Sequence, residues 1–497
     1  MQKLLRDMGK NSIRIGICHI YHLKEYAQSI LFIHLSYLNN VVKGVGENCQ
    51  NIVFSPTSDS ARKIAMALGD TSNGIEGELI EYYGMTVREN YSLCQTLEKG
   101  VAYHHGKLPM HVRRTLEKAI ADKKINTVVC TTTLLQGVNL PAQNVFIRNP
   151  HLYVKKQKES SELTNYEMAN LRGRAGRLLK DYIGRTFVMD EDEFIDSEGY
   201  EQLELFEDVT KELPSGYEQK FEEYKDFIEE ALDNNTPVDA TMKKYGYIIS
   251  YIRQSVLKYG AESRGRMKNV GIKLTQKQVA AIILKLDSID VPKEICYKNR
   301  YWDPLVLDYI YNEYDGKLPN TPMEKGAKSK LDKAMRFLRE NDVTAEMYDK
   351  NIPSSYRKGT MRSIMSSLSL QWANGKALCE ILNNSRYEGD DGADNIDSTI
   401  ELLQNTISYN LPLLLKPLYD MKQSESPFLK CMQVGAFGVV ERCMIEMGVP
   451  RESALYLYKE IFDEKEIKVE NRLELEQIIR EKIRLEYKNI PYWIQVQ

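Results

Sequence analysis

The stretch NIVFSPTS, residues 51–58, decides the fold class. Its first four residues form a short apolar run, and Ser55-Pro-Thr-Ser58 interrupts that run with residues typical of a turn. Apolar residues then recur at helical spacing, at Ala61, Ile64, Ala65 and Leu68. A strand that leads through a short loop into a helix is the unit of parallel sheets with crossover helices. The stretch therefore predicts an α/β domain.

The same alternation continues to about residue 190. Pro109 is a typical first residue of a helix, and the apolar residues after it fall on one helical face. Further short apolar runs predict strands at 101–104, 126–130, 145–148 and 184–189. We therefore expect one parallel sheet with covering helices over residues 49–195.

Beyond residue 195 the chain changes character. Charged stretches with helical spacing, such as 217–232, 242–258 and 473–487, dominate, and strand signals become sparse. Loop-forming residues near 319–322 indicate a boundary. We expect a helical lead-in at 1–48, a helical module at 196–318 and a helical bundle at 319–497.

Composition limits the class of protein. With 497 residues, 42% hydrophobic and 28% charged, the chain is globular and long enough for several cores. A net charge of -3 restricts any nucleic-acid site to a local basic surface. Eight cysteines without a CxxC pair, and histidines confined to residues up to His151, predict no metal site. With no secretory signal and no apolar segment long enough for a bilayer, we expect a cytoplasmic protein that does not enter membranes.

Two stretches carry residues suited to phosphate. In NLRGRAGR, residues 170–177, Asn170, Arg174 and Arg177 fall on one helical stripe, and the arginines are bidentate cationic donors. The alternative is a solvated basic helix end. In TTTLLQGVNLPA, residues 131–142, hydroxyls and a glycine turn follow an expected strand, at the edge where open parallel sheets bind ligands. The alternative is an ordinary loop rich in threonine, with glycine and proline as turn-forming residues.

These stretches resemble motifs of superfamily-2 helicases. Residues 170–177 resemble motif VI, QxxGRxGR, with Asn170 in place of the usual glutamine, and residues 131–142 resemble motif V of the branch with RNA-exosome and archaeal DNA-repair helicases. Residues 51–63 resemble motif IV, and 101–106 resemble the HHAG stretch of that branch. The resemblance covers about residues 50–190, and their order along the chain makes it specific.

The resemblance implies the second RecA-like lobe of such a helicase, followed by a winged helix and a helical bundle. It implies that Arg177 is an arginine finger on the γ-phosphate and Arg174 its companion. Contacts to ATP would come from Asn170, Gly137 and Asn139. Contacts to nucleic acid would come from Ser55, Thr57, His104, His105, Thr131 and Thr132.

A P-loop, GxxxxGK[ST], and an acidic Mg²⁺-binding motif are missing from the sequence. We therefore expect ATP and Mg²⁺ to be shared with a first lobe outside this chain, and the isolated chain to be inactive. A split-gene subunit, an internal start and a truncated reading frame all fit this expectation. The predicted function is the second motor lobe of an ATP-dependent helicase or translocase on single-stranded DNA or RNA. The alternative is a non-catalytic nucleic-acid-binding or partner-docking module.

Overall fold

The contacts of the chain separate it into two units, each built from segments far apart in the sequence. In a computed structural model, unit 1 comprises Met1–Gln202, Ala377–Glu401 and Cys443–Gln497, and unit 2 comprises Leu203–Lys376 and Leu402–Arg442. The expected bundle at 319–497 is thus divided between the two units. The structure describes residues 12–15, 18–22, 31–46, 49–68, 77–131, 142–147, 151–154, 159–162, 170, 175, 184–189, 215–388, 392–422, 426–462 and 471–497.

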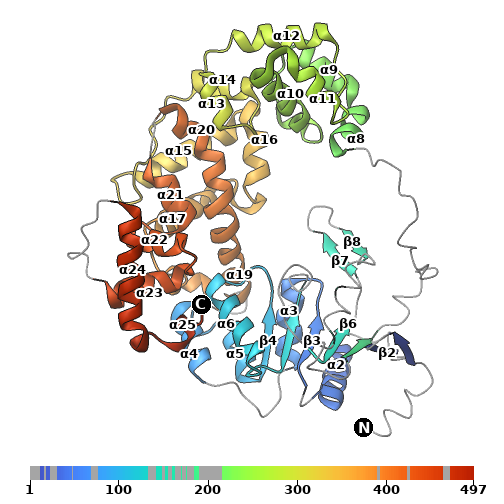
Figure 1. Ribbon diagram of the computed structural model, residues 1–497, viewed down its shortest axis with the longest axis vertical. Helices are drawn as coiled ribbons and strands as arrows, with labels where there is room; N and C mark the ends of the chain where they lie inside the picture. Colours follow the sequence, from blue (N-terminus) through green and yellow to red (C-terminus); the bar gives the residue numbers. More distant parts are fainter. Residues whose placement is uncertain are drawn as a thin grey trace. The chain divides into compact units, whose positions relative to one another are not determined.

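A seven-stranded sheet forms the centre of unit 1, in the order β1-β2-β9-β6-β3-β5-β4 (Figure 1). Strand β1 is antiparallel to β2, and all other neighbours are parallel. The strands are β1 (Ser12–Ile15), β2 (Cys18–His22), β3 (Asn51–Phe54), β4 (Val101–His104), β5 (Thr127–Cys130), β6 (Asn144–Ile147) and β9 (Gly184–Val188). Strand β3 is buried along its whole length, as expected for a central parallel strand. The predicted α/β fold with a parallel sheet is confirmed.

The helices of this lobe follow the expected apolar faces. Helix α3 (Ser58–Leu68) buries the four predicted residues, and α6 (Met110–Ala121) follows Pro109 at its N-cap. Three further helices, α2 (Leu31–Gly46), α4 (Gly77–Thr86) and α5 (Ser92–Glu98), complete the described covering. The lead-in also adds β1 and β2 to the sheet, so residues 1–48 are not helical throughout. A separate hairpin joins β7 (His151–Val154) to β8 (Glu159–Glu162).

Neighbouring residues of β4 show that α5 and α6 lie on opposite faces of the sheet. Successive side chains of a strand point to opposite faces. The Tyr103 hydroxyl lies 2.7 Å from the Ser92 hydroxyl on α5. The next residue, His104, contacts Glu117 of α6 through Nε2 at 3.1 Å. The handedness of parallel crossovers requires the same arrangement, because the chain crosses the sheet in opposite directions before and after β4.

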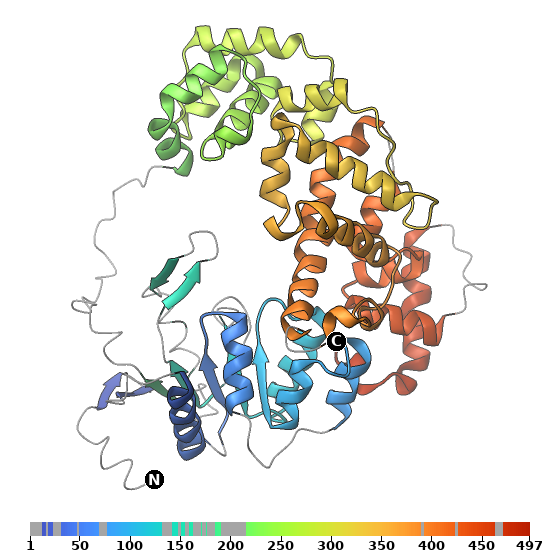
Figure 2. The same cartoon turned by 180° about the vertical axis from the view of Figure 1, so that it is seen from behind.

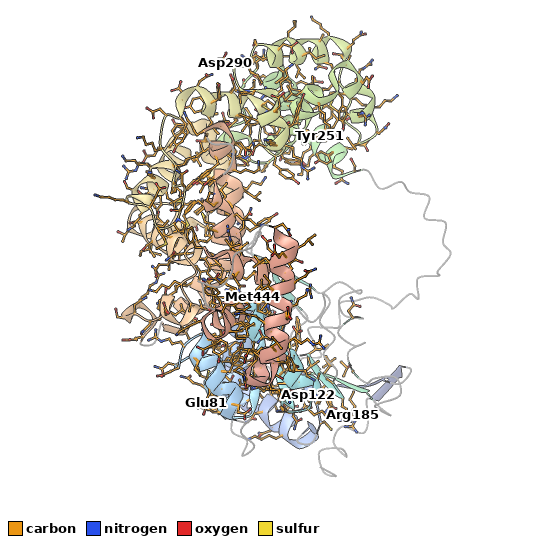
Figure 3. The ribbon with its side chains drawn as sticks, turned by 60° about the vertical axis from the view of Figure 1, so that its left-hand side comes forward. Glu81, Asp122, Arg185, Tyr251, Asp290 and Met444 are labelled. Carbon is orange, nitrogen blue, oxygen red and sulfur yellow. The ribbon has the colours of Figure 1, made fainter. Side chains whose placement is uncertain are left out.

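The returning segments, residues 377–401 and 443–497, pack against the lobe. Helix α18 (Leu378–Ile381) contacts α4, and α23 (Arg451–Ile461) contacts α6. Arg88 donates to the Leu382 carbonyl at 2.6 Å, and Arg114 donates to the Gly448 carbonyl at 2.8 Å. Tyr492 donates to Asp122 at 3.3 Å, at the end of α6 (Figure 3). The remaining described helices of these segments are η6 (Ser385–Tyr387), α19 (Gly392–Glu401), α24 (Arg472–Glu486), η8 (Tyr487–Asn489) and α25 (Tyr492–Gln495).

The described residues of unit 2 form helices joined by turns and loops, with no strand among them (Figure 2). The described residues 215–318 hold no strand, so the wing strands of a winged helix are not among them. The larger helices are α8 (Gly216–Glu223), α9 (Lys225–Asp233), α10 (Gly246–Tyr259), α12 (Gln276–Asp287), α14 (Pro304–Glu313), α15 (Ala327–Glu340), α16 (Asp342–Asn351), α17 (Gly359–Ala373), π-helix η7 (Leu402–Asn410), α20 (Leu411–Lys422) and α21 (Pro427–Val434). Helix α22 (Val439–Glu446) extends from unit 2 into unit 1. Among the described residues, no helix is both long and apolar enough to cross a membrane.

Candidate nucleic-acid interface

The carboxyl ends of β3, β5 and β4 bring three of the predicted stretches together. The Ser55 amide donates to the Cys130 carbonyl at 2.8 Å, and the Thr131 amide donates to the His104 carbonyl at 3.2 Å. The loops that follow the three strands therefore start side by side. This edge is where open parallel sheets bind their ligands.

The hydroxyls of Ser55 and Thr57 hold the loop that leads into α3. Ser55 is fully buried, and its hydroxyl donates to the Thr57 carbonyl at 3.2 Å. The Thr57 hydroxyl accepts the Ser60 amide at 3.1 Å, which is an N-cap of α3. The Ser55 hydroxyl donates within the loop, whereas the Thr57 hydroxyl only accepts, so its O–H, the loop backbone and the N-terminus of α3 can meet a phosphate.

The two adjacent histidines are interior residues. His104 is 1% exposed and lies against Glu117, and His105 is fully buried and stacked on Tyr103, with ring centroids 5.3 Å apart. Neither ring nitrogen of His105 has a hydrogen-bond partner among the described residues. Burial, helped by the nearby cations, lowers the pKa of His105 to about 3, so its ring is neutral. In this arrangement both rings support the loop from within.

The stretches that resemble motifs V and VI are joined at one point. Ala142 and Ala175 form an isolated parallel bridge, so the end of the first stretch lies beside the middle of the second. Thr131 is buried, and Asn170 is helical and half-buried. The other predicted residues of these stretches lie outside the described residues: Thr132, Gly137, Asn139, Arg174 and Arg177.

An ionic cluster that the sequence does not suggest lies beside this edge. Arg62 of α3 is 8% exposed and donates to Asp59 at 2.9 Å and to Asp394 of α19. Its Nη1 atom lies 3.5 Å from Asp397. Lys107, in the loop after β4, pairs with Glu401 of α19 at 3.1 Å. Within the described ranges, no group of three or more His, Cys, Asp or Glu side chains is arranged to hold a metal ion.

Asp397 makes the stability of this cluster dependent on pH. Burial raises the pKa of Asp397 to about 6, although Arg62 and Lys107 oppose the shift. Asp394, Asp59, Tyr91 and Tyr103 are the other titratable groups that interact with it. A carboxyl whose pKa is higher in the folded state stabilises the fold below its unfolded value, and this contribution is lost as pH rises through about 6. The shift corresponds to at most about 3 kcal/mol.

We therefore expect Asp397→Asn to flatten the fall in stability between pH 5 and pH 8. Arg62 keeps Asp59 and Asp394 as partners in this variant, so unit 1 should be as stable as the unchanged protein, or more stable, at pH 8. Thermal unfolding at the two pH values measures the effect. Asp394→Asn, on the same helix but with a largely exposed carboxylate, is the matched control. Equal pH dependence in all three proteins would contradict the assignment.

Comparisons with known proteins agree with this geometry. Residues 34–179 match the helicase conserved C-terminal domain. The human "Helicase POLQ-like" protein is 32% identical over 139 residues, which cover 27% of this chain and 11% of that protein. "ATP-dependent DNA helicase Hel308" of Methanococcus vannielii is 31% identical over 121 residues, covering 24% and 16%. "Activating signal cointegrator 1 complex subunit 3" of Gallus gallus is 25% identical over 265 residues, covering 50% and 12%.

The chain therefore spans a small part of each of these longer relatives. The matched range contains strands β3, β4, β5 and β6 of the sheet and both stretches joined by the Ala142–Ala175 bridge. Residues 34–179 are a helicase conserved C-terminal domain, and these matches support a C-terminal half of a superfamily-2 helicase.

Proposed function

We propose that the chain supplies the second lobe of an ATP-driven motor that moves along a single nucleic-acid strand. A first lobe, elsewhere in the protein or on another chain, completes the motor with a P-loop and a Mg²⁺ site. The observation that carries the proposal is the match of residues 34–179 to the helicase C-terminal domain, since it includes the stretches that resemble motifs V and VI.

Arg174 and Arg177 are assigned to the nucleotide. Arginine is permanently charged and offers donors in a planar fork that fits phosphate oxygens. Placed against the γ-phosphate across a cleft, such side chains stabilise the charge that spreads over the transferred group. Asn170, Gly137 and Asn139 are assigned to the same nucleotide. Mg²⁺, when bound, would neutralise the phosphates from the first lobe, because the described residues here offer no cluster of ligands for it.

Binding of the nucleic-acid strand is assigned to the loops at the carboxyl ends of β3, β4 and β5. The inward direction of the Ser55 hydroxyl and of the His104 and His105 rings favours contacts through loop backbone and the first turn of α3. Backbone amides and a helix N-terminus suit phosphate oxygens and read no base. We therefore expect the motor lobe to bind strands of different base sequence with similar affinity.

Nucleic-acid-stimulated ATP hydrolysis tests the function. The full chain is assayed alone and then with a candidate first-lobe protein, with single-stranded DNA and RNA oligonucleotides as stimulants. Turnover is expected only in the mixture, because neither half holds the complete set of phosphate contacts. Hydrolysis by the chain alone would refute the two-part motor. Strand binding without turnover in any mixture would instead favour a non-catalytic nucleic-acid-binding module.

A further inference from the structure

Three carboxylates of α19 lie along the carboxyl edge of the lobe. Asp394, Asp397 and Glu401 are spaced i, i+3 and i+7, so they share one face of the helix. Asp394 and Asp397 meet Arg62 of α3, and Glu401 meets Lys107 after β4. A helix from the returning segments therefore presents a row of negative charge to the two cations beside the proposed strand-binding loops.

The cluster holds more negative than positive charge. With Asp59, the cluster has four carboxylates against three cations, Arg62, Lys107 and Lys63, the last paired with Asp59 at 2.7 Å. Nη1 of Arg62 is buried without a hydrogen bond, although it lies 3.5 Å from Asp397. A buried ion pair of this kind adds little to stability, since the attraction must offset the desolvation of both charges. The arrangement is thus poorly explained as a device that only holds α19 in place.

The positions of the two cations suit a phosphate. Helix α3 starts four residues after β3 ends, and Arg62 lies in its second turn. Lys107 comes three residues after the end of β4. Both residues therefore lie close to the loops that follow the carboxyl ends of β3 and β4. The His105 ring beneath them has no hydrogen-bond partner among the described residues, and the charges of Arg62 and Lys107 help to lower its pKa.

We propose that Arg62 and Lys107 form a phosphate-binding subsite for a single nucleic-acid strand, and that the carboxylates of α19 occupy this subsite when no strand is bound. This inference rests on the proposed function, since it adds a subsite to the same interface. The strand and α19 compete: binding of phosphate requires Asp394, Asp397 and Glu401 to leave the two cations, so α19 lowers the affinity for nucleic acid.

Equilibrium binding of a fluorescent oligothymidylate to the full chain tests the competition. Asp394→Asn, Asp397→Asn and Glu401→Gln in one variant remove the row of charge without shortening the side chains, and should tighten binding about three- to tenfold at low salt. Adding Arg62→Ala and Lys107→Ala to this variant should cancel the gain. It should also reduce the slope of log affinity against log salt by about 1.4, that is about 0.7 for each lost phosphate contact on a single strand.

Charge-matched variants and hydrogen exchange separate the possible outcomes. Glu78→Gln, Glu81→Gln and Glu98→Gln remove three exposed carboxylates elsewhere in the lobe, and an equal gain there would show a general charge effect and overturn the subsite.

In the unmutated chain, binding of the nucleic-acid strand should speed hydrogen exchange of the amides of 392–401. Unchanged or slower exchange overturns the displacement of α19 even if the triple variant fails to fold. No strand binding by any of these proteins would refute the proposed interface itself. Binding by the unmutated chain without a gain in a folded triple variant refutes only the subsite.

Discussion

Replacing Arg177 with Ala is expected to lower the nucleic-acid-stimulated ATP turnover of the two-part motor by about 10³- to 10⁵-fold. The arginine would act on charge that develops in the transition state, so its loss should reduce turnover and leave binding of the strand nearly unchanged. Steady-state ATP hydrolysis and oligonucleotide binding, measured on the same reassembled protein, distinguish the two effects. Unchanged turnover would remove Arg177 from the nucleotide site.

Two further variants sharpen this test. Arg177→Lys keeps the charge and loses the planar fork, so its turnover should fall between those of the unchanged protein and of Arg177→Ala. Arg185→Ala is the matched control. Arg185 is the second residue of β9, at the amino end of this parallel strand, and therefore at the edge of the sheet opposite the proposed site. It should leave turnover within about twofold, a change of less than about 0.5 kcal/mol.

The parallel strands were predictable because each is a short apolar run between turn-forming residues. Strands β3 and β4 occupy the predicted residues, β5 and β9 differ from prediction by one residue at one end, and β6 begins and ends one residue earlier than predicted. Helices α4 and α5 were missed because local signals are weak there. Helix α5 has seven residues and no side-chain cap, and α4 contains Gly84. The fold holds α4 through tertiary contacts such as the 2.8 Å hydrogen bond between Tyr83 and Thr115.

The candidate site was predictable in position but not in the direction of its side chains. Parallel topology alone requires the ends of β3, β4 and β5 to share an edge, and the Ser55 and Thr131 amide bonds confirm this. Whether a residue at a strand end points outward depends on the register of the sheet and on the covering helices. In β4, His104 points to the face of the sheet that α6 covers, so its ring lies against Glu117.

The cluster around α19 could not have been found from sequence patterns. Arg62 and Asp394 are 332 residues apart, whereas helical periodicity relates residues only within one helix. The division of the C-terminal region between two units could not be predicted for the same reason. Apolar spacing shows that a helix has a buried face, but it does not show which partner covers that face.

In unit 2, Asp303→Ala is expected to lower the free energy of unfolding by about 3–5 kcal/mol. Arg253 and Asp303 form an ion pair at 2.6 Å, with side chains 2% and 1% exposed. Asp303 also accepts the backbone amides of Val238 at 2.9 Å and Leu305 at 3.2 Å. The substitution leaves the guanidinium buried with the Ala231 carbonyl as its remaining partner here, and leaves both amides without their acceptor.

A second ion pair of unit 2 provides the control for this effect. Lys293 and Asp287 are 2.8 Å apart, but their side chains are 47% and 58% exposed. Water solvates both charges, so Asp287→Ala should change stability by at most about 1 kcal/mol. Urea unfolding gives the free energy of unfolding. Hydrogen exchange at the amides of α10, measured in a separate experiment, reports on the stability of the helix that carries Arg253. Equal losses in the two variants would mean that water reaches Arg253. Asp303→Asn should lose less than Asp303→Ala, because its single amide oxygen keeps one of the two acceptors that Val238 and Leu305 use, while the charge and the other acceptor are lost.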